Sequence, residues 1–109
     1  MKLIDTLTTM FRHNLWANIR ILERCAELNI EQLNASISGT YGSIHETLQH
    51  IVSAEQSYFS RISTGEPCHR PDDEPPMTFA EMVESVRITG TGFIEWAPRV
   101  LAEDTVIIN

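Results

Sequence analysis

The chain has 109 residues, the size of one small domain, and a domain this small buries roughly two-thirds of the surface of its unfolded chain. Its formal net charge of −7 repels phosphate backbones, which argues against nucleic acid as a partner. The sequence contains neither the run of about 18 apolar residues that a membrane helix requires nor a secretory signal, so we expect a cytoplasmic protein without membrane contacts.

The first helical pattern lies between residues 3 and 28. Apolar side chains recur there at steps of three and four residues, which predicts one long amphipathic helix: Leu3, Leu7, Met10, Phe11, Leu15, Ile19, Leu22 and Ala26. We expect Trp16 and Trp96 to anchor the core or its boundary. Cys25 and Cys68 form neither a disulfide framework nor a CxxC motif and are predicted to be reduced thiols, with Cys25 in or beside the core.

A second helix is predicted to follow a connector over residues 29–42. We expect the apolar residues of the connector, Ile30, Leu33 and Ile37, to hold it against the helices. Ser43 and Glu46 have the spacing of a capping box, which satisfies unpaired amides at a helix start. The apolar stripe behind this box predicts a helix that ends near Ser63.

A loop and a third helix complete the pattern. Residues 65–77 carry four prolines and predict a solvated loop that crosses between the ends of a bundle. Thr78 and Glu81 repeat the capping box and begin a helix that Gly90 and Gly92 weaken. Pro98 is expected to kink or interrupt this helix, and residues 105–109 have an extended, apolar pattern.

The fold class predicted from these elements is all-α. Three amphipathic helices joined by two connectors indicate a bundle, and three helices leave an open groove. A fourth helix or a second subunit is expected to cover it.

The four histidines do not form a helical metal pair. Two ligands on one helix face stand three or four residues apart, and His13, His45, His50 and His69 include no such pair. His45 and His50 diverge by about 140° around a helix axis, so we do not expect them to share a metal. His50 falls at the margin of its apolar stripe, where it faces a groove between helices or is a plain surface imidazole. Glu46, on the same helix face, either orients His50 or only completes the capping box.

Two blocks of sequence resemble the DinB-like family of small helical metalloproteins. They are residues 13–22 (HNLWANIRIL) and residues 39–55 (GTYGSIHETLQHIVSAE), and the resemblance extends from residue 3 to about residue 104. It implies an up-down-up-down four-helix bundle, of which a single domain at 1–109 encodes about three helices. By the same resemblance His50 corresponds to the first metal ligand of the family. The other two ligands lie in an HxxxH-type motif on a fourth helix, and the sequence ends at Asn109 before it.

The resemblance also implies a function, although the family is named for induction by DNA damage. It indicates a divalent-metal-dependent enzyme, a transferase of the thiol-dependent type or a hydrolase, with zinc or nickel, a low-molecular-weight thiol and a small-molecule substrate. With one ligand we expect impaired metal binding. Glu55 lies within the apolar stripe and either supports the metal site or pairs with an arginine. The alternative is a non-catalytic helical module that forms a homo-oligomer or binds a partner through the open face.

Overall fold

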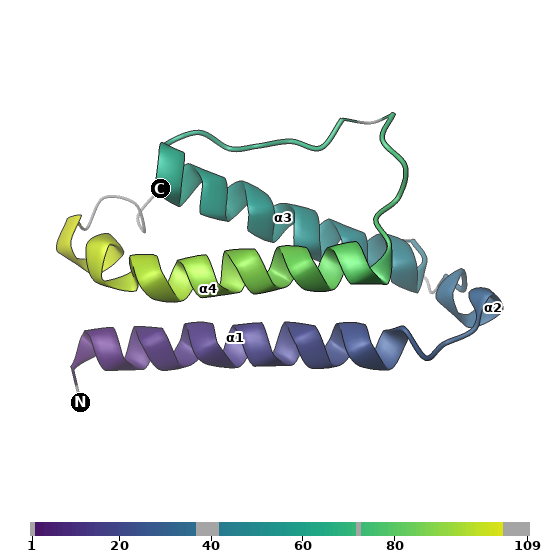
Figure 1. Cartoon of the computed structure of the whole chain (residues 1–109), viewed down its shortest axis with the longest axis horizontal. Helices are drawn as coiled ribbons and strands as arrows, with labels where there is room; N and C mark the ends of the chain where they lie inside the picture. Colours follow the sequence, from purple (N-terminus) through teal and green to yellow (C-terminus); the bar gives the residue numbers. More distant parts are fainter. Residues whose placement is uncertain (1, 37–41, 72, 104–109) are drawn as a thin grey trace.

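The computed structural model describes residues 2–36, 42–71 and 73–103, with side chains up to residue 99. This part of the chain forms four helices, α1 (Leu3–Cys25), α2 (Ile30–Leu33), α3 (Ile44–Thr64) and α4 (Phe79–Glu103). The three long helices lie side by side, and α4 packs against both α1 and α3 (Figure 1). The predicted all-α bundle is confirmed.

The directions of the helices differ from strict alternation. Phe11 of α1 stacks on Phe93 of α4 with ring centroids 5.2 Å apart, and Leu15 packs beside Gly90, so these two helices are antiparallel. Near the start of α3, His45 contacts Met77, which lies just before α4. Farther along α3, Phe59 contacts Phe93, which lies farther along α4. The helices α3 and α4 are therefore parallel.

The expected up-down-up-down order is thus correct from α1 to α3 and wrong for α4. The physical reason is the segment 65–78, which crosses the length of the bundle as predicted and returns the chain to the end at which α3 starts (Figure 1). A short turn would have reversed the chain, whereas a crossing of this length allows a parallel neighbour.

Both predicted capping boxes are present. The Ser43 hydroxyl accepts from the Glu46 amide at 3.1 Å, and the Glu46 carboxylate accepts from the Ser43 amide at 3.1 Å. Thr78 and Glu81 form the same pair of bonds at the start of α4. A third box, between Asn29 and Gln32, starts α2, which lies in the predicted connector.

The core lies where the three long helices meet. Its buried side chains come from α1, α3, α4 and the end of the crossing segment: Leu22, Leu48, Val52, Met77, Met82 and Val86. The helix α4 continues through Gly90 and Gly92, where added Cβ atoms would collide with Leu15 and with the Phe59 ring. It also continues through Pro98, after which the last turns bend away from the helix axis (Figure 1).

Some side chains lie elsewhere than the sequence predicts. Trp16 is 59% exposed, with the Arg20 guanidinium 6.0 Å from its ring centre, and Ile30 is 77% exposed, so neither anchors the core. Trp16 and Ile30 each lie on a surface that the neighbouring helices do not cover. Cys25 is half-buried against the core, Cys68 is exposed, and both are free thiols. Ile37 and the predicted extended residues 105–109 lie outside the described residues.

Candidate functional site

His50 lies on the exposed side of α3, beside the crossing segment. It lines a groove of about 880 Å³ together with His45, His69 and Arg70. This position agrees with the predicted margin of the apolar stripe, although the groove is bounded by α3 and by residues 69–71 and 74–76 rather than by two helices. The role of His50 as a metal ligand stays a prediction.

His45 serves to attach the crossing segment to α3. Its Nε2 atom donates to the backbone oxygen of Met77 at 2.9 Å, and the Met77 amide donates to the Gln49 side chain at 2.8 Å. The imidazole also packs edge-on against the Phe79 ring, with the two ring centroids 5.7 Å apart. His45 thus positions the start of α4.

Glu46 is engaged in its capping box with Ser43. Hydrogen bonds from the Ser43 amide and hydroxyl lower the pKa of Glu46, because both bonds favour the ionised carboxylate. Bonds from Thr78 lower the pKa of Glu81 in the same way. The capping-box interpretation of Glu46 is confirmed, and an orienting role toward His50 stays a prediction.

The described residues do not by themselves form a complete metal centre. Within residues 2–36, 42–71 and 73–103, no group of three or more His, Cys, Asp or Glu side chains is placed to hold a metal ion. Structural and catalytic zinc sites use at least three protein ligands.

A different feature, the α1/α3 face, lies on the side of the bundle away from α4. We define it by Met10 and Ile21 of α1 and by Ile51 and Tyr58 of α3, which are 62%, 49%, 43% and 64% exposed. Ile21 and Ile51 line one small cavity of about 20 Å³ between the two helices. Ile21 and Ile51 therefore face a common gap.

Both helices carry this face at heptad spacing. Steps of four and three residues generate the stripe of α1, namely Leu3, Leu7, Met10, Asn14, Ala17 and Ile21. The same steps generate the stripe of α3, namely Ile44, Leu48, Ile51, Glu55, Tyr58 and Ile62. A repeat of this kind is typical of helices that pack lengthwise against another helix. Each stripe has one polar interruption, Asn14 or Glu55.

The two interruptions meet in one polar cluster. The Glu55 carboxylate accepts from the side-chain amides of Asn18 at 2.9 Å and Asn14 at 3.4 Å, and from the Thr89 hydroxyl at 2.8 Å. Two helices, α1 and α4, thus supply donors to one half-buried carboxylate on α3. Of the two interpretations of Glu55, the ion pair with an arginine is absent among the described residues, where the donors to this carboxylate are neutral amides and a hydroxyl.

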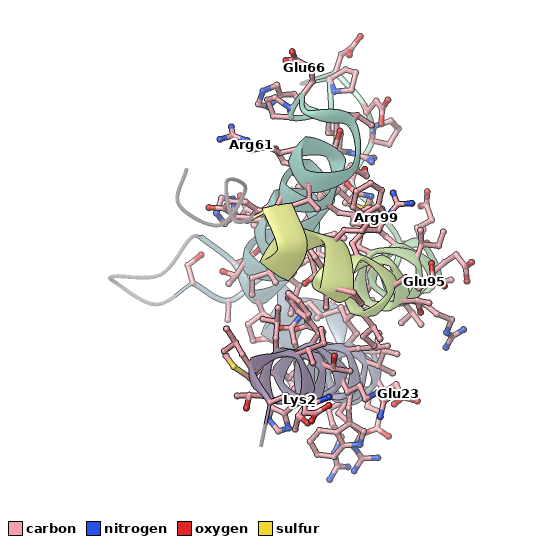
Figure 2. The ribbon with its side chains drawn as sticks, turned by 90° about the vertical axis from the view of Figure 1, so that its left-hand side faces the viewer. Lys2, Glu23, Arg61, Glu66, Glu95 and Arg99 are labelled. Carbon is pink, nitrogen blue, oxygen red and sulfur yellow. The ribbon has the colours of Figure 1, made fainter. Side chains whose placement is uncertain are left out.

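Positive charge flanks the α1/α3 face. Arg61 extends from α3 on the side away from α4, whereas Glu95 lies on the outer side of α4 (Figure 2). Arg24, three positions after Ile21, is exposed on α1 and pairs loosely with Glu27 at 3.8 Å. The face therefore has basic margins although the whole chain has a net charge of −7.

The sequence patterns alone did not predict this polar centre. Glu55 was recognised as a carboxylate within an apolar stripe, yet its donors lie 37 and 34 positions away in Asn18 and Thr89. The heptad repeat, with Asn14 and Glu55 as single polar positions, was the signal that would have placed them together.

Comparison with known families identifies the class of this protein. The model of the DinB family matches residues 3–103, and the chain belongs to that family. Comparison with curated proteins and with solved structures gives no match. Within the described residues, no helix is long and apolar enough to span a membrane.

Proposed function

We propose that this DinB family protein is a helix-binding module, whose α1/α3 face accepts one amphipathic helix of a partner polypeptide. The observation that carries the proposal is the pair of heptad stripes, which leave large apolar side chains exposed on both sides of one gap. Binding of an amphipathic helix in an apolar groove is a common mode of peptide recognition.

The apolar contribution to binding is modest. Met10, Ile21, Ile51 and Tyr58 are each 43–64% exposed, and burying the rest of one such side chain contributes about 1 kcal/mol. Association entropy offsets much of the sum. We therefore expect a dissociation constant of roughly tens to hundreds of micromolar for an unoptimised helix.

A second copy of the chain is a poorer occupant because of charge. A two-fold interface places the same surface of each subunit in contact with itself, so central Glu55 residues would approach each other. The basic margins at Arg24 and Arg61 would also face their own copies. A helix with acidic residues beside its apolar stripe complements these margins instead.

Fluorescence anisotropy with a labelled peptide tests the proposal. The peptide has about three heptads, leucine at the a and d positions and glutamates beside them, and sedimentation first shows that it is monomeric at the concentration used. We expect saturable binding that Ile51→Asp weakens at least tenfold. Ile88→Asp is the matched control, because Ile88 is 58% exposed on α4, outside the face.

Three results would overturn the proposal. The peptide fails to bind, or Ile88→Asp weakens binding as much as Ile51→Asp does. The third is a stable dimer of the purified chain that Ile51→Asp dissociates, which would assign the face to a second copy. Circular dichroism of each variant shows whether the helices remain folded.

Family membership and the exposure of His50 support a second candidate, a divalent-metal-dependent enzyme of the thiol-transferase type. The described residues supply no set of three ligands, so this candidate requires ligands from outside them. Elemental mass spectrometry of the purified chain tests it. One equivalent of zinc or nickel that His50→Ala removes would favour the enzyme, and substoichiometric metal that is insensitive to this change would count against it.

A further inference from the structure

We infer that Glu55 selects a partner helix that carries an arginine at the centre of its apolar stripe. This inference rests on the helix-binding function proposed above and specifies the chemistry of the helix that is bound. Glu55 lies midway along the face, between the apolar pair Ile21 and Ile51 at one end and Met10 and Tyr58 at the other.

The local hydrogen bonds leave the charge of the carboxylate uncompensated. An ionised carboxylate only accepts hydrogen bonds and offers about four lone-pair sites. Asn18 and Asn14 donate to Oε2 and Thr89 donates to Oε1, and all three donors are neutral. The ion pairs among the described residues join Arg24 to Glu27 and Arg70 to Glu74, and neither includes Glu55.

Docking changes the environment of Glu55. In the isolated chain Glu55, which bonds to Asn18 across the gap between α1 and α3, is half-buried and so keeps partial contact with water. An apolar helix over this gap would remove that water and bury an unpaired charge, which costs far more than burying a paired one. A cation on the docked helix removes this penalty. The cluster therefore discriminates between helices that would otherwise bury the same apolar area.

Arginine suits the geometry better than lysine. The hydrogen bonds that the Glu55 oxygens accept come from α1 and α4, so a donor on the docked helix would add a further bond to this carboxylate. A guanidinium carries several donors in a planar fork and is less strongly hydrated than an ammonium group, so it tolerates burial against a carboxylate. A single polar layer in a heptad stripe also fixes the register of the helices that share it.

Two versions of the labelled peptide test the inference. They differ only at the central stripe position, which is arginine in one and leucine in the other. We expect the wild-type chain to bind the arginine peptide at least about tenfold more tightly. Glu55→Gln should abolish this preference, and Glu55→Leu should reverse it.

Glu95→Gln is the matched control, because Glu95 lies on the outer side of α4 (Figure 2). It should leave the preference for arginine unchanged, and a general effect of net charge would instead alter it as much as Glu55→Gln does. Equal affinity of wild-type chain for the two peptides would refute the selection by Glu55 while leaving helix binding intact. Failure of both peptides to bind would refute helix binding itself. Thermal melts of Glu55→Gln and Glu55→Leu show whether the two variants are folded.

Discussion

The two sides of the helix pair α1 and α3 differ in how closely a neighbour can approach. On the α4 side, glycines and stacked rings allow close contact, and Met82, Val86 and Ala97 are at most 1% exposed. On the α1/α3 face, side chains of similar hydrophobicity remain about half exposed. The exposure of an apolar residue in this protein is therefore set by whether a neighbouring helix covers it.

Backbone and polar groups explain this difference. Gly90 and Gly92 remove side-chain volume where α4 meets Leu15 and Phe59, so three helices share one core. Between α1 and α3, by contrast, the Asn18 to Glu55 hydrogen bond occupies the middle of the gap. A carboxylate with its donors keeps the two helices apart, because pushing it into the core would cost more than the added apolar contact gains.

Truncating one side chain on each side should produce the largest contrast. Met82 is completely buried, and we expect Met82→Ala to lower the free energy of unfolding by about 2–5 kcal/mol. Ile51 is 43% exposed, and Ile51→Ala should lower it by less than about 1.5 kcal/mol. Urea denaturation followed by circular dichroism measures both. Equal losses would show that the α1/α3 face is as well packed as the core.

Adding a side chain at Gly90 should destabilise the closely packed contact between α1 and α4. A Cβ at Gly90 would lie 2.6 Å from Leu15 Cδ1, so Gly90→Val should cost about 1–3 kcal/mol through overpacking. Ala80→Val is the control, because Ala80 is exposed near the start of α4 and should change stability by less than about 1 kcal/mol. If Gly90→Val were neutral under the same urea titration, α1 and α4 would be separated more widely than the structure shows.

Much of the fold follows from local sequence signals, whereas the site does not. The capping boxes at Ser43 and Thr78 and the proline-rich crossing segment predict the starts of α3 and α4 and the loop between them. These signals act over a few residues, so periodicity and spacing are sufficient to read them.

Contacts between distant segments determine the rest. The direction of α4 depends on how far residues 65–78 travel, and the hydrogen bond from His45 to Met77 that ends this crossing joins residues 32 positions apart. The donors of Glu55 come from two other helices for the same reason. Sequence patterns place each of these residues on a helix face but do not show which faces meet.

Removing one donor from the polar cluster should have a moderate effect. Thr89 is 5% exposed and donates to Glu55 at 2.8 Å, so Thr89→Val, which keeps the shape of the side chain, should cost about 1–2 kcal/mol. Thr91→Val is the control, because Thr91 is exposed on the same helix and should be nearly neutral. Differential scanning calorimetry compares the two variants with the wild-type chain. Equal thermal unfolding midpoints for all three proteins would show that the hydrogen bond from Thr89 to Glu55 adds no measurable stability.

The smallest effect is expected at the helix starts, which belong to neither side of the comparison. The folded chain lowers the pKa values of Glu46 and Glu81, so the unfolded chain binds more protons in acid. The stability contributed by the two carboxylates is fully present above their unfolded pKa values and is lost as pH falls through the folded ones. Thermal midpoints measured from about pH 7 down to pH 3 should therefore fall less steeply for the double variant Glu46→Gln and Glu81→Gln than for the wild-type chain.

Two single variants test whether the acid dependence comes from the capping boxes and not from the core or the α1/α3 face. Met82→Ala and Ile51→Ala change no titratable group, so each should shift the midpoint by its own amount and retain the acid slope of the wild-type chain. An unchanged slope in the double glutamine variant would show that the capping boxes add no measurable pH dependence, which would contradict the lowered pKa values of Glu46 and Glu81.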